Sequence, residues 1–115
     1  MGNEQLIADL KGTKANLVKH GRCTGGFVDD EGKLCLLGAI SQTVSGMGFP
    51  YLNFSGPHTT GIKDDPVFMR YKAVADELRK VHGGGGIDLY NDKPSTTDDD
   101  IYTLIDKALA GLGGL

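Results

Sequence analysis

Glycine clusters are the feature that most limits how this chain can fold. The sequence holds 18 glycines in 115 residues, and many of them gather at 25–26, 83–86 and 111–114. Glycine adopts a positive φ at no steric cost, but it loses more conformational entropy than other residues on folding. The clusters therefore predict short elements joined by tight turns. At this length we expect one domain that spans residues 1–115.

Four segments between these clusters have the apolar spacing of amphipathic helices. The first begins after Asn3, a helix-capping residue, and the last follows Thr96 or Thr97, with three aspartates in its first turn. The predicted helices cover residues 3–20, 36–47, 66–82 and 97–112. We expect a core made of Leu10, Leu17, Leu37, Ile40, Val44, Val74, Leu78, Ile101, Ile105 and Leu109.

Residues 22–35 have the pattern of a small hairpin. Phe27-Val28 and residues 33–35 flank residues 29–32, an Asp-Asp-Glu-Gly sequence with turn chemistry. Residues 87–90 also have an extended pattern. The predicted fold class is therefore α+β: a single small domain of about four helices with a two-stranded β-hairpin between helices 1 and 2.

Residues 48–65 show no sustained period, yet they include Phe49, Tyr51, Leu52 and Phe54, which are too apolar for a free linker. A loop of this length in a small domain is either packed against the core or functional. We therefore consider its aromatic residues a candidate binding surface.

The charge balance disfavours nucleic acid as a partner. The chain has 12 Lys and Arg against 15 Asp and Glu, a formal charge of −3, whereas nucleic-acid affinity comes mainly from neutralising phosphates with basic side chains. No apolar run is long enough to span a bilayer, and the N-terminus lacks the pattern of a secretory signal. We expect a cytoplasmic protein without a membrane partner.

Cys23 and Cys35 are the only cysteines of the chain, and a reducing cytoplasm would keep them as thiols that pack like small apolar residues. A disulfide across the predicted hairpin is geometrically plausible but disfavoured by that compartment. The sharper alternative places Cys35 at a helix N-terminus, where its pKa would be lowered. With His82 and Asn91 or Asp92 it would then form a hydrolase site.

The sequence predicts no metal site and no cofactor. The cysteines and the three histidines show no ligand spacing typical of zinc, and the acidic run at 98–100 does not match a calcium loop. The glycines at 83–86 follow a predicted helix rather than precede one, so they favour a turn over a phosphate loop.

Three motifs together resemble a family. They are Cys23-Thr24-Gly25, then residues 35–40 (CLLGAI), then residues 90–94 (YNDKP) followed by Thr96-Thr97. In this order they resemble a small family of unknown function in actinobacteria and their phages, with the patterns W-C-Q-G, C-A-L-G-A-L and W-N-D-x-P-x-T. Here Arg22 replaces the first Trp, Thr24 replaces Gln and Tyr90 replaces the second aromatic residue. The resemblance implies a fold and a source, not a reaction.

Three functional classes follow, and the sequence favours the first. It is a non-enzymatic accessory protein of an actinobacteriophage that binds a macromolecule, such as a host protein, in the host cytoplasm. The second is a small-ligand binder that sequesters a nucleotide signal and forms a homo-oligomer. The third is the Cys35 hydrolase. No catalytic residue is predicted, and the predicted binding residues are Arg22, Cys23, Thr24, Tyr90, Asn91, Asp92 and Thr96.

Overall fold

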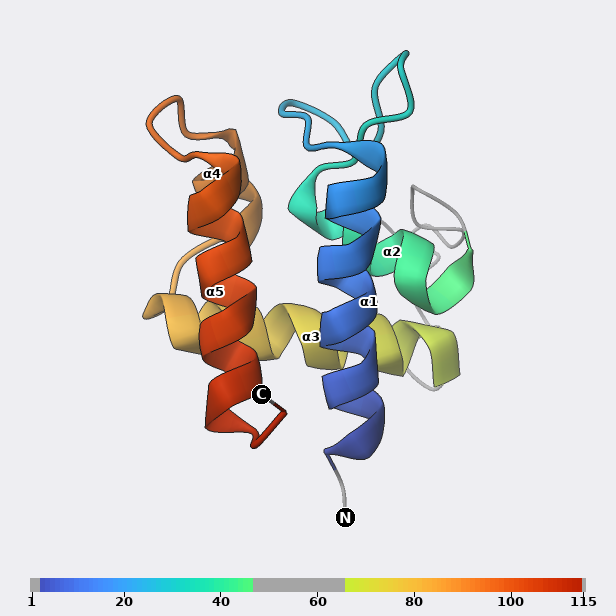
Figure 1. Cartoon of the computed structure of the whole chain (residues 1–115), viewed down its shortest axis with the longest axis vertical. Helices are drawn as coiled ribbons and strands as arrows, with labels where there is room; N and C mark the ends of the chain where they lie inside the picture. Colours follow the sequence, from blue (N-terminus) through green and yellow to red (C-terminus); the bar gives the residue numbers. More distant parts are fainter. Residues whose placement is uncertain (1–2, 47–65, 115) are drawn as a thin grey trace, which may run out of the picture.

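The computed structural model describes residues 3–46 and 66–114, and within these ranges every regular element is an α-helix (Figure 1). In chain order they are α1 (Glu4–His20), α2 (Leu36–Ser45), α3 (Pro66–His82), α4 (Ile87–Asp92) and α5 (Asp98–Gly111). Helices α1 and α5 run side by side in opposite directions, and α3 crosses both (Figure 1). Helix α2 packs on α1 and α3, and the short α4 contacts α2 and α3.

The predicted caps of α1 and α5 act in the structure, except for one. Helix α1 stops at Gly21, whose φ is 87° and whose N–H donates to the carbonyl oxygen of Leu17. Helix α5 begins with a reciprocal pair: the Asp100 N–H donates to Thr97 Oγ1 at 3.1 Å, and the Thr97 N–H donates to Asp100 Oδ2 at 2.9 Å. The exception is Asn3, whose side chain makes no capping hydrogen bond.

Helix α1 approaches α2 closely at Gly12. A Cβ atom at this position would lie 2.6 Å from Thr43 Cγ2, and one turn further along Asn16 Nδ2 donates to Thr43 Oγ1 at 2.9 Å. Glycine inside a helix costs about 1 kcal/mol relative to alanine. Here the missing side chain is what allows the two helices to meet.

Nine of the ten predicted core residues are buried, and the core also holds buried apolar residues that were not predicted, among them Leu34, Ile87 and Leu104. Every predicted core side chain except that of Leu37 is at most 7% exposed. Leu36 is fully buried instead, because α2 turns that side chain toward the other helices. Leu37 is only half-buried, and it lines a pocket described below.

One carboxylate lies inside this core and ties two helices together. Asp9 of α1 is 3% exposed. Its two carboxylate oxygens accept hydrogen bonds from Arg70 of α3, with Nη2 at 2.8 Å from Oδ1 and Nε at 3.1 Å from Oδ2. Gln5 Nε2 also donates to Asp9 Oδ1 at 3.0 Å. The two-point contact satisfies a charge that burial alone would make costly.

The predicted β-hairpin is wrong, and with it the α+β class: the described residues contain no strand. Within 22–35 there are only isolated bridges, in which Leu34 pairs with Arg22 on one side and with Val28 on the other. The chain reverses at Gly25, where φ is 82°, and α2 begins directly after the paired segment. Each pairing therefore involves one residue on each side, which is too short to form a β-ladder.

Residues 87–90 were also expected to be extended, but they lie in α4. The preceding Gly83, Gly84 and Gly85 all have positive φ and reverse the chain after α3. Gly86 then serves as the N-cap with extended backbone. The chain is thus redirected before residue 87, which leaves enough residues for a short helix.

The predictions for residues 48–65, including the aromatic binding surface, lie outside the described residues. Of the helices that the structure describes, none combines the length and the apolar character that crossing a membrane requires.

Candidate functional site

A buried asparagine joins the 22–35 loop to α4 and α2. Asn91 is 1% exposed. Its Nδ2 donates to the carbonyl oxygen of Cys23 and to Asp92 Oδ1, both at 3.0 Å, and its Oδ1 accepts the N–H of Leu36 at 3.2 Å. The Leu36 N–H is one of the amides in the first turn of α2 that have no partner within the helix. Asn91 therefore caps the N-terminus of α2, although it lies 55 residues further along the chain than Leu36.

Arg22 also joins the 22–35 loop to α4 and to the start of α5. Its Nη1 donates to the carbonyl oxygen of Asn91 at 2.6 Å, its Nη2 to the carbonyl oxygen of Thr96 at 2.7 Å, and its Nε to Asp98 Oδ1 at 2.7 Å. Only 10% of the Arg22 side chain is exposed. The planar guanidinium suits such a three-way contact, which an ammonium group cannot reproduce. We call the set of Arg22, Cys23, Leu36, Asn91, Thr96 and Asp98 the Asn91 junction.

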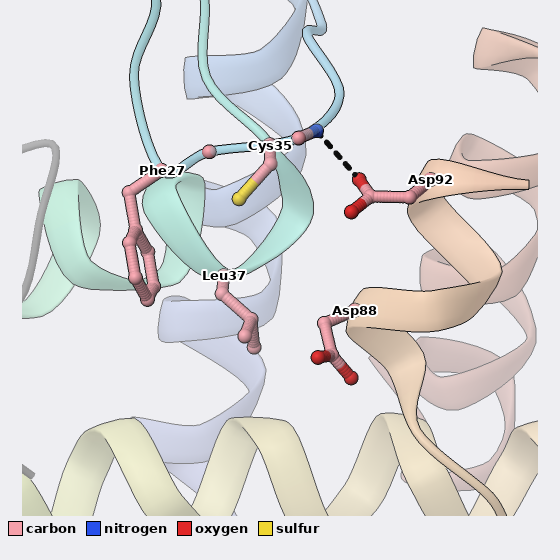
Figure 2. A pocket seen from close by; sticks show the side chains of 7 residues that line it. Phe27, Cys35, Leu37, Asp88 and Asp92 are labelled. Carbon is pink, nitrogen blue, oxygen red and sulfur yellow. Dashed lines mark hydrogen bonds between the residues drawn. The ribbon is translucent and has the colours of Figure 1, made fainter. Parts of the chain in front are cut away.

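A pocket of about 150 Å³ lies next to this junction (Figure 2). Asp88 and Asp92 of α4 form one wall, and Cys35 and Leu37, at the start of α2, lie across from them. Phe27 extends the apolar side. We call it the Cys35 pocket, and its lining residues are Gly25, Gly26, Phe27, Cys35, Leu37, Asp88 and Asp92.

The two carboxylates of this pocket are not neutralised. Asp92 Oδ1 accepts the N–H of Gly25 at 3.0 Å and the amide of Asn91. Asp88 has no hydrogen-bond partner in the part of the chain described, and no basic side chain there forms an ion pair with either aspartate. Like charges one helical turn apart destabilise a helix by a few tenths of a kcal/mol. The pocket thus keeps a local negative charge that no basic side chain of the described residues balances.

The Cys35 thiol is poorly suited to nucleophilic chemistry. Burial raises its pKa to about 11, although its Sγ also accepts the N–H of Gly38 at 3.2 Å as the N-cap of α2. Burial outweighs the helix terminus, so the prediction of a lowered pKa is wrong. The pKa of Cys23 is raised too, first by burial and then by the charges of Asp29 and Asp92.

Neither cysteine is in a disulfide, and their packing differs. Cys35 is 7% exposed, as expected for a thiol in a core. Cys23 is only half-buried, and its Sγ lies 3.2 Å from the carbonyl oxygen of Lys33 as a weak donor. The interpretation of both as packing residues thus holds for Cys35 and only partly for Cys23.

Five of the seven predicted binding residues come together in and around the Asn91 junction, namely Arg22, Cys23, Asn91, Asp92 and Thr96. Several of their contacts are with one another, and of the five only Asp92 lines the Cys35 pocket. The other two line neither the junction nor the Cys35 pocket. Thr24 is exposed on the loop, and the ring of Tyr90 lies 4.4 Å from the ring of His82 in a second pocket, which Asp92 also lines. Their role in binding stays a prediction.

Sequence reasoning missed Asp88, Leu37 and Phe27 as pocket residues. The available signal was the spacing of Asp88 and Asp92, which places both on one face of a helix. That signal was hidden because residues 87–90 were expected to be extended.

The histidines do not complete a catalytic site in the described residues. No described histidine lines the Cys35 pocket, and His82 Nδ1 lies 3.0 Å from the carbonyl oxygen of Gly84. A search of the described residues for three or more His, Cys, Asp or Glu side chains that could share a metal ion finds none.

The sequence as a whole matches one family model. The chain belongs to DUF6197, a family of unknown function, whose model matches residues 1–110. Neither a search of curated proteins nor a search of solved structures finds a match to this chain.

Proposed function

We propose that this DUF6197 member is a non-enzymatic binding module that takes a Lys or Arg side chain of a partner protein into the Cys35 pocket. The observation that carries the proposal is the pair of unneutralised carboxylates, Asp88 and Asp92, on one wall of a pocket whose other wall is apolar. Long basic side chains combine an apolar stem with a charged end, and they pack each part against a matching surface.

The geometry supports a contact at both parts of such a side chain. Leu37 and Phe27 offer apolar surface to the methylene groups, while Asp88 and Asp92 can accept hydrogen bonds from an ammonium or guanidinium group. A pocket of about 150 Å³ is also smaller than the sites that enclose drug-sized ligands, at roughly 300–1,000 Å³. It therefore suits one side chain better than a whole small molecule.

The two alternatives have less support. A nucleotide would bring phosphates toward Asp88 and Asp92, and like charges repel. A hydrolase needs a thiolate near neutral pH, whereas burial raises the pKa of Cys35 to about 11. We therefore keep the binding module as the proposed function.

The source and the partner belong to the same proposal. The resemblance of the three sequence motifs to proteins of actinobacteria and their phages supports an accessory protein of an actinobacteriophage. The partner that we propose is then a host protein, bound in the host cytoplasm during infection.

The test is an NMR titration of the ¹⁵N-labelled full chain with N-acetyl-arginine amide and, as the neutral analogue of nearly the same shape, N-acetyl-citrulline amide. We expect the arginine compound alone to shift the amide signals of Gly25, Gly26, Leu37 and Asp88. The Asp88→Asn variant should weaken this binding roughly tenfold, as removal of a charge-assisted contact predicts.

The matched control is Asp99→Asn, the same change at an exposed aspartate outside the pocket. It should leave binding unchanged. Equal shifts with citrulline, or equal losses in the two variants, would show that the carboxylates of the pocket do not select a cation, and the proposal would be wrong.

A further inference from the structure

Helices α1 and α5 leave an open groove between them that shares no residue with the Cys35 pocket. Its volume is about 460 Å³. Most of its lining residues come from α1, and two come from α5. The lining residues are Lys11, Lys14, Ala15, Val18, Lys19, Asp106 and Leu109.

The groove has an apolar floor that extends from a buried to an exposed side chain. Leu109 is nearly buried at its base, whereas Val18 is 63% exposed. Val18 lies on the exposed side of α1 with Ala15, three residues before it, whereas Leu10 and Leu17 of the same helix are fully buried on another side. Ala15, Val18 and Leu109 together form an apolar surface that another molecule can cover.

The rim of the groove is basic, although the chain as a whole carries a formal charge of −3. Lys14 Nζ lies 2.9 Å from Asp106 Oδ1, an ion pair that joins α1 to α5 and neutralises the one acidic residue of the lining. Lys11 and Lys19 are exposed and have no ion-pair partner among the described residues. Two unpaired positive charges therefore flank the apolar floor.

We propose that this groove binds an acidic amphipathic helix of a partner protein. Lys11 and Lys19 lie two turns apart on α1, about 12 Å along its axis. A partner helix laid in the groove can place one apolar side chain against Val18 and Leu109 and acidic side chains opposite both lysines. Charge complementarity of this kind selects the partner and speeds its approach.

The probe is a fluorescein-labelled synthetic peptide of about four helical turns, with Leu at helical spacing and Glu at the remaining positions. Its binding to the full chain is measured by fluorescence anisotropy at low and physiological salt. We expect saturable binding that weakens with salt. The double variant Lys11→Glu/Lys19→Glu should raise the Kd roughly tenfold or more, since two rim contacts become repulsive.

The matched control is Lys93→Glu/Lys107→Glu, which makes the same charge change at two exposed lysines outside the groove. It should change the Kd less than about twofold. A third variant, Val18→Ser, should weaken binding without changing charge. All the substituted residues are exposed, so circular dichroism should confirm that each variant folds.

Four results would overturn the proposal. The first is no saturable binding of the peptide, and the second is an equal loss in both double variants. The third is equal binding of a peptide in which Ser replaces every Leu, because charge alone would then explain the affinity. Binding of phosphatidylglycerol vesicles in place of the peptide would assign the groove to a membrane surface instead.

Discussion

Asn91 and Asp92 are neighbours in the chain, but they take part in two regions with opposite chemistry. In the Asn91 junction, the side-chain oxygen and nitrogen of Asn91 both have partners, and Arg22 uses three of its nitrogens. In the Cys35 pocket, Asp88 has no partner among the described residues, and its wall carries two negative charges. The polar groups of the junction are hydrogen-bonded to one another, whereas among the described residues the pocket holds one carboxylate without a partner, Asp88, and one that accepts two hydrogen bonds but has no basic partner, Asp92.

The comparison separates residues that build a site from residues that act in it. Among the described residues, no buried side-chain nitrogen or oxygen lacks a hydrogen-bond partner. A polar side chain with every bond satisfied inside the protein has little left for a ligand. Substitutions in the junction should therefore act on stability, and substitutions in the pocket should act on binding.

Asn91→Ala tests this division most severely. It leaves the Leu36 N–H and the Cys23 carbonyl oxygen buried without their partner, so we expect a loss of about 3 kcal/mol in the free energy of unfolding. Urea unfolding followed by circular dichroism measures it. Asn16→Ala, which removes one partly buried bond to Thr43, should cost about 1 kcal/mol. Equal losses would mean that the junction has no special role.

Arg22→Lys keeps the positive charge but cannot reach Asn91, Thr96 and Asp98 together. We expect a loss of about 2 kcal/mol in the free energy of unfolding, again from urea curves. Arg79→Lys is the matched control, because Arg79 is exposed and Asp76 is its one ion-pair partner within 3–46 and 66–114. Its cost should be below about 0.5 kcal/mol. A loss below that same limit for Arg22→Lys would show that charge, not geometry, matters in the junction.

Cys35 of the pocket makes the free energy of unfolding depend on pH. Burial raises its pKa from the ordinary value of 9.0 to about 11, so the folded state holds the proton that the unfolded state releases. This stabilisation is complete below about pH 9 and is lost as the pH rises through 11, and a shift of this size corresponds to about 3 kcal/mol.

Urea unfolding at a series of pH values measures this effect. Cys35→Ser keeps a side chain that can accept the Gly38 N–H but does not ionise in this range, so it should remove most of the loss. The same slope in Cys35→Ser as in the natural chain would assign the alkaline loss to other groups, such as Tyr71, whose pKa burial also raises.

Asp88→Asn should have the smallest effect on stability and so gives the sharpest contrast with Asn91→Ala. It removes one of two like charges on α4 and breaks no hydrogen bond among the described residues. We expect a change within about 0.5 kcal/mol, because relief of the repulsion from Asp92 is offset by loss of the favourable interaction of Asp88 with the N-terminus of α4. The same urea assay measures it. A loss above about 1 kcal/mol would show that Asp88 supports the fold and that the two regions are not distinct.

The long helices could be predicted because their sequences carry several independent signals. Helix α5 has apolar spacing, a Thr cap and an Asp three residues later, and all three act in the structure. Helix α4 has only six residues, too few for a period to distinguish a helix from a strand. The prediction of a hairpin was wrong because Leu34 pairs with both Arg22 and Val28 in isolated bridges, and the sequence pattern does not distinguish such bridges from two strands.

The candidate site was harder to predict than the fold. The family resemblance pointed to Arg22, Cys23 and residues 90–92, and these segments do meet. Their meeting depends on contacts between residues about 70 positions apart, such as the bond from Arg22 to Asn91, which local patterns do not encode. Asp88 and Asp92 share a wall of the pocket only because α4 is a helix, and the sequence pattern did not predict this helix.

The Asn91 junction also has a consequence for the order of folding. Helices α1 and α2 are close in sequence and can pair early, but the N–H of Leu36 must wait for a side chain 55 residues later. Closing so long a loop costs conformational entropy before the contact that it allows can form. During synthesis, the first two helices therefore leave the ribosome before the residue that completes them. In mutational φ-value analysis, Asn91 should report a contact formed after the rate-limiting step, and its loss should mainly speed unfolding.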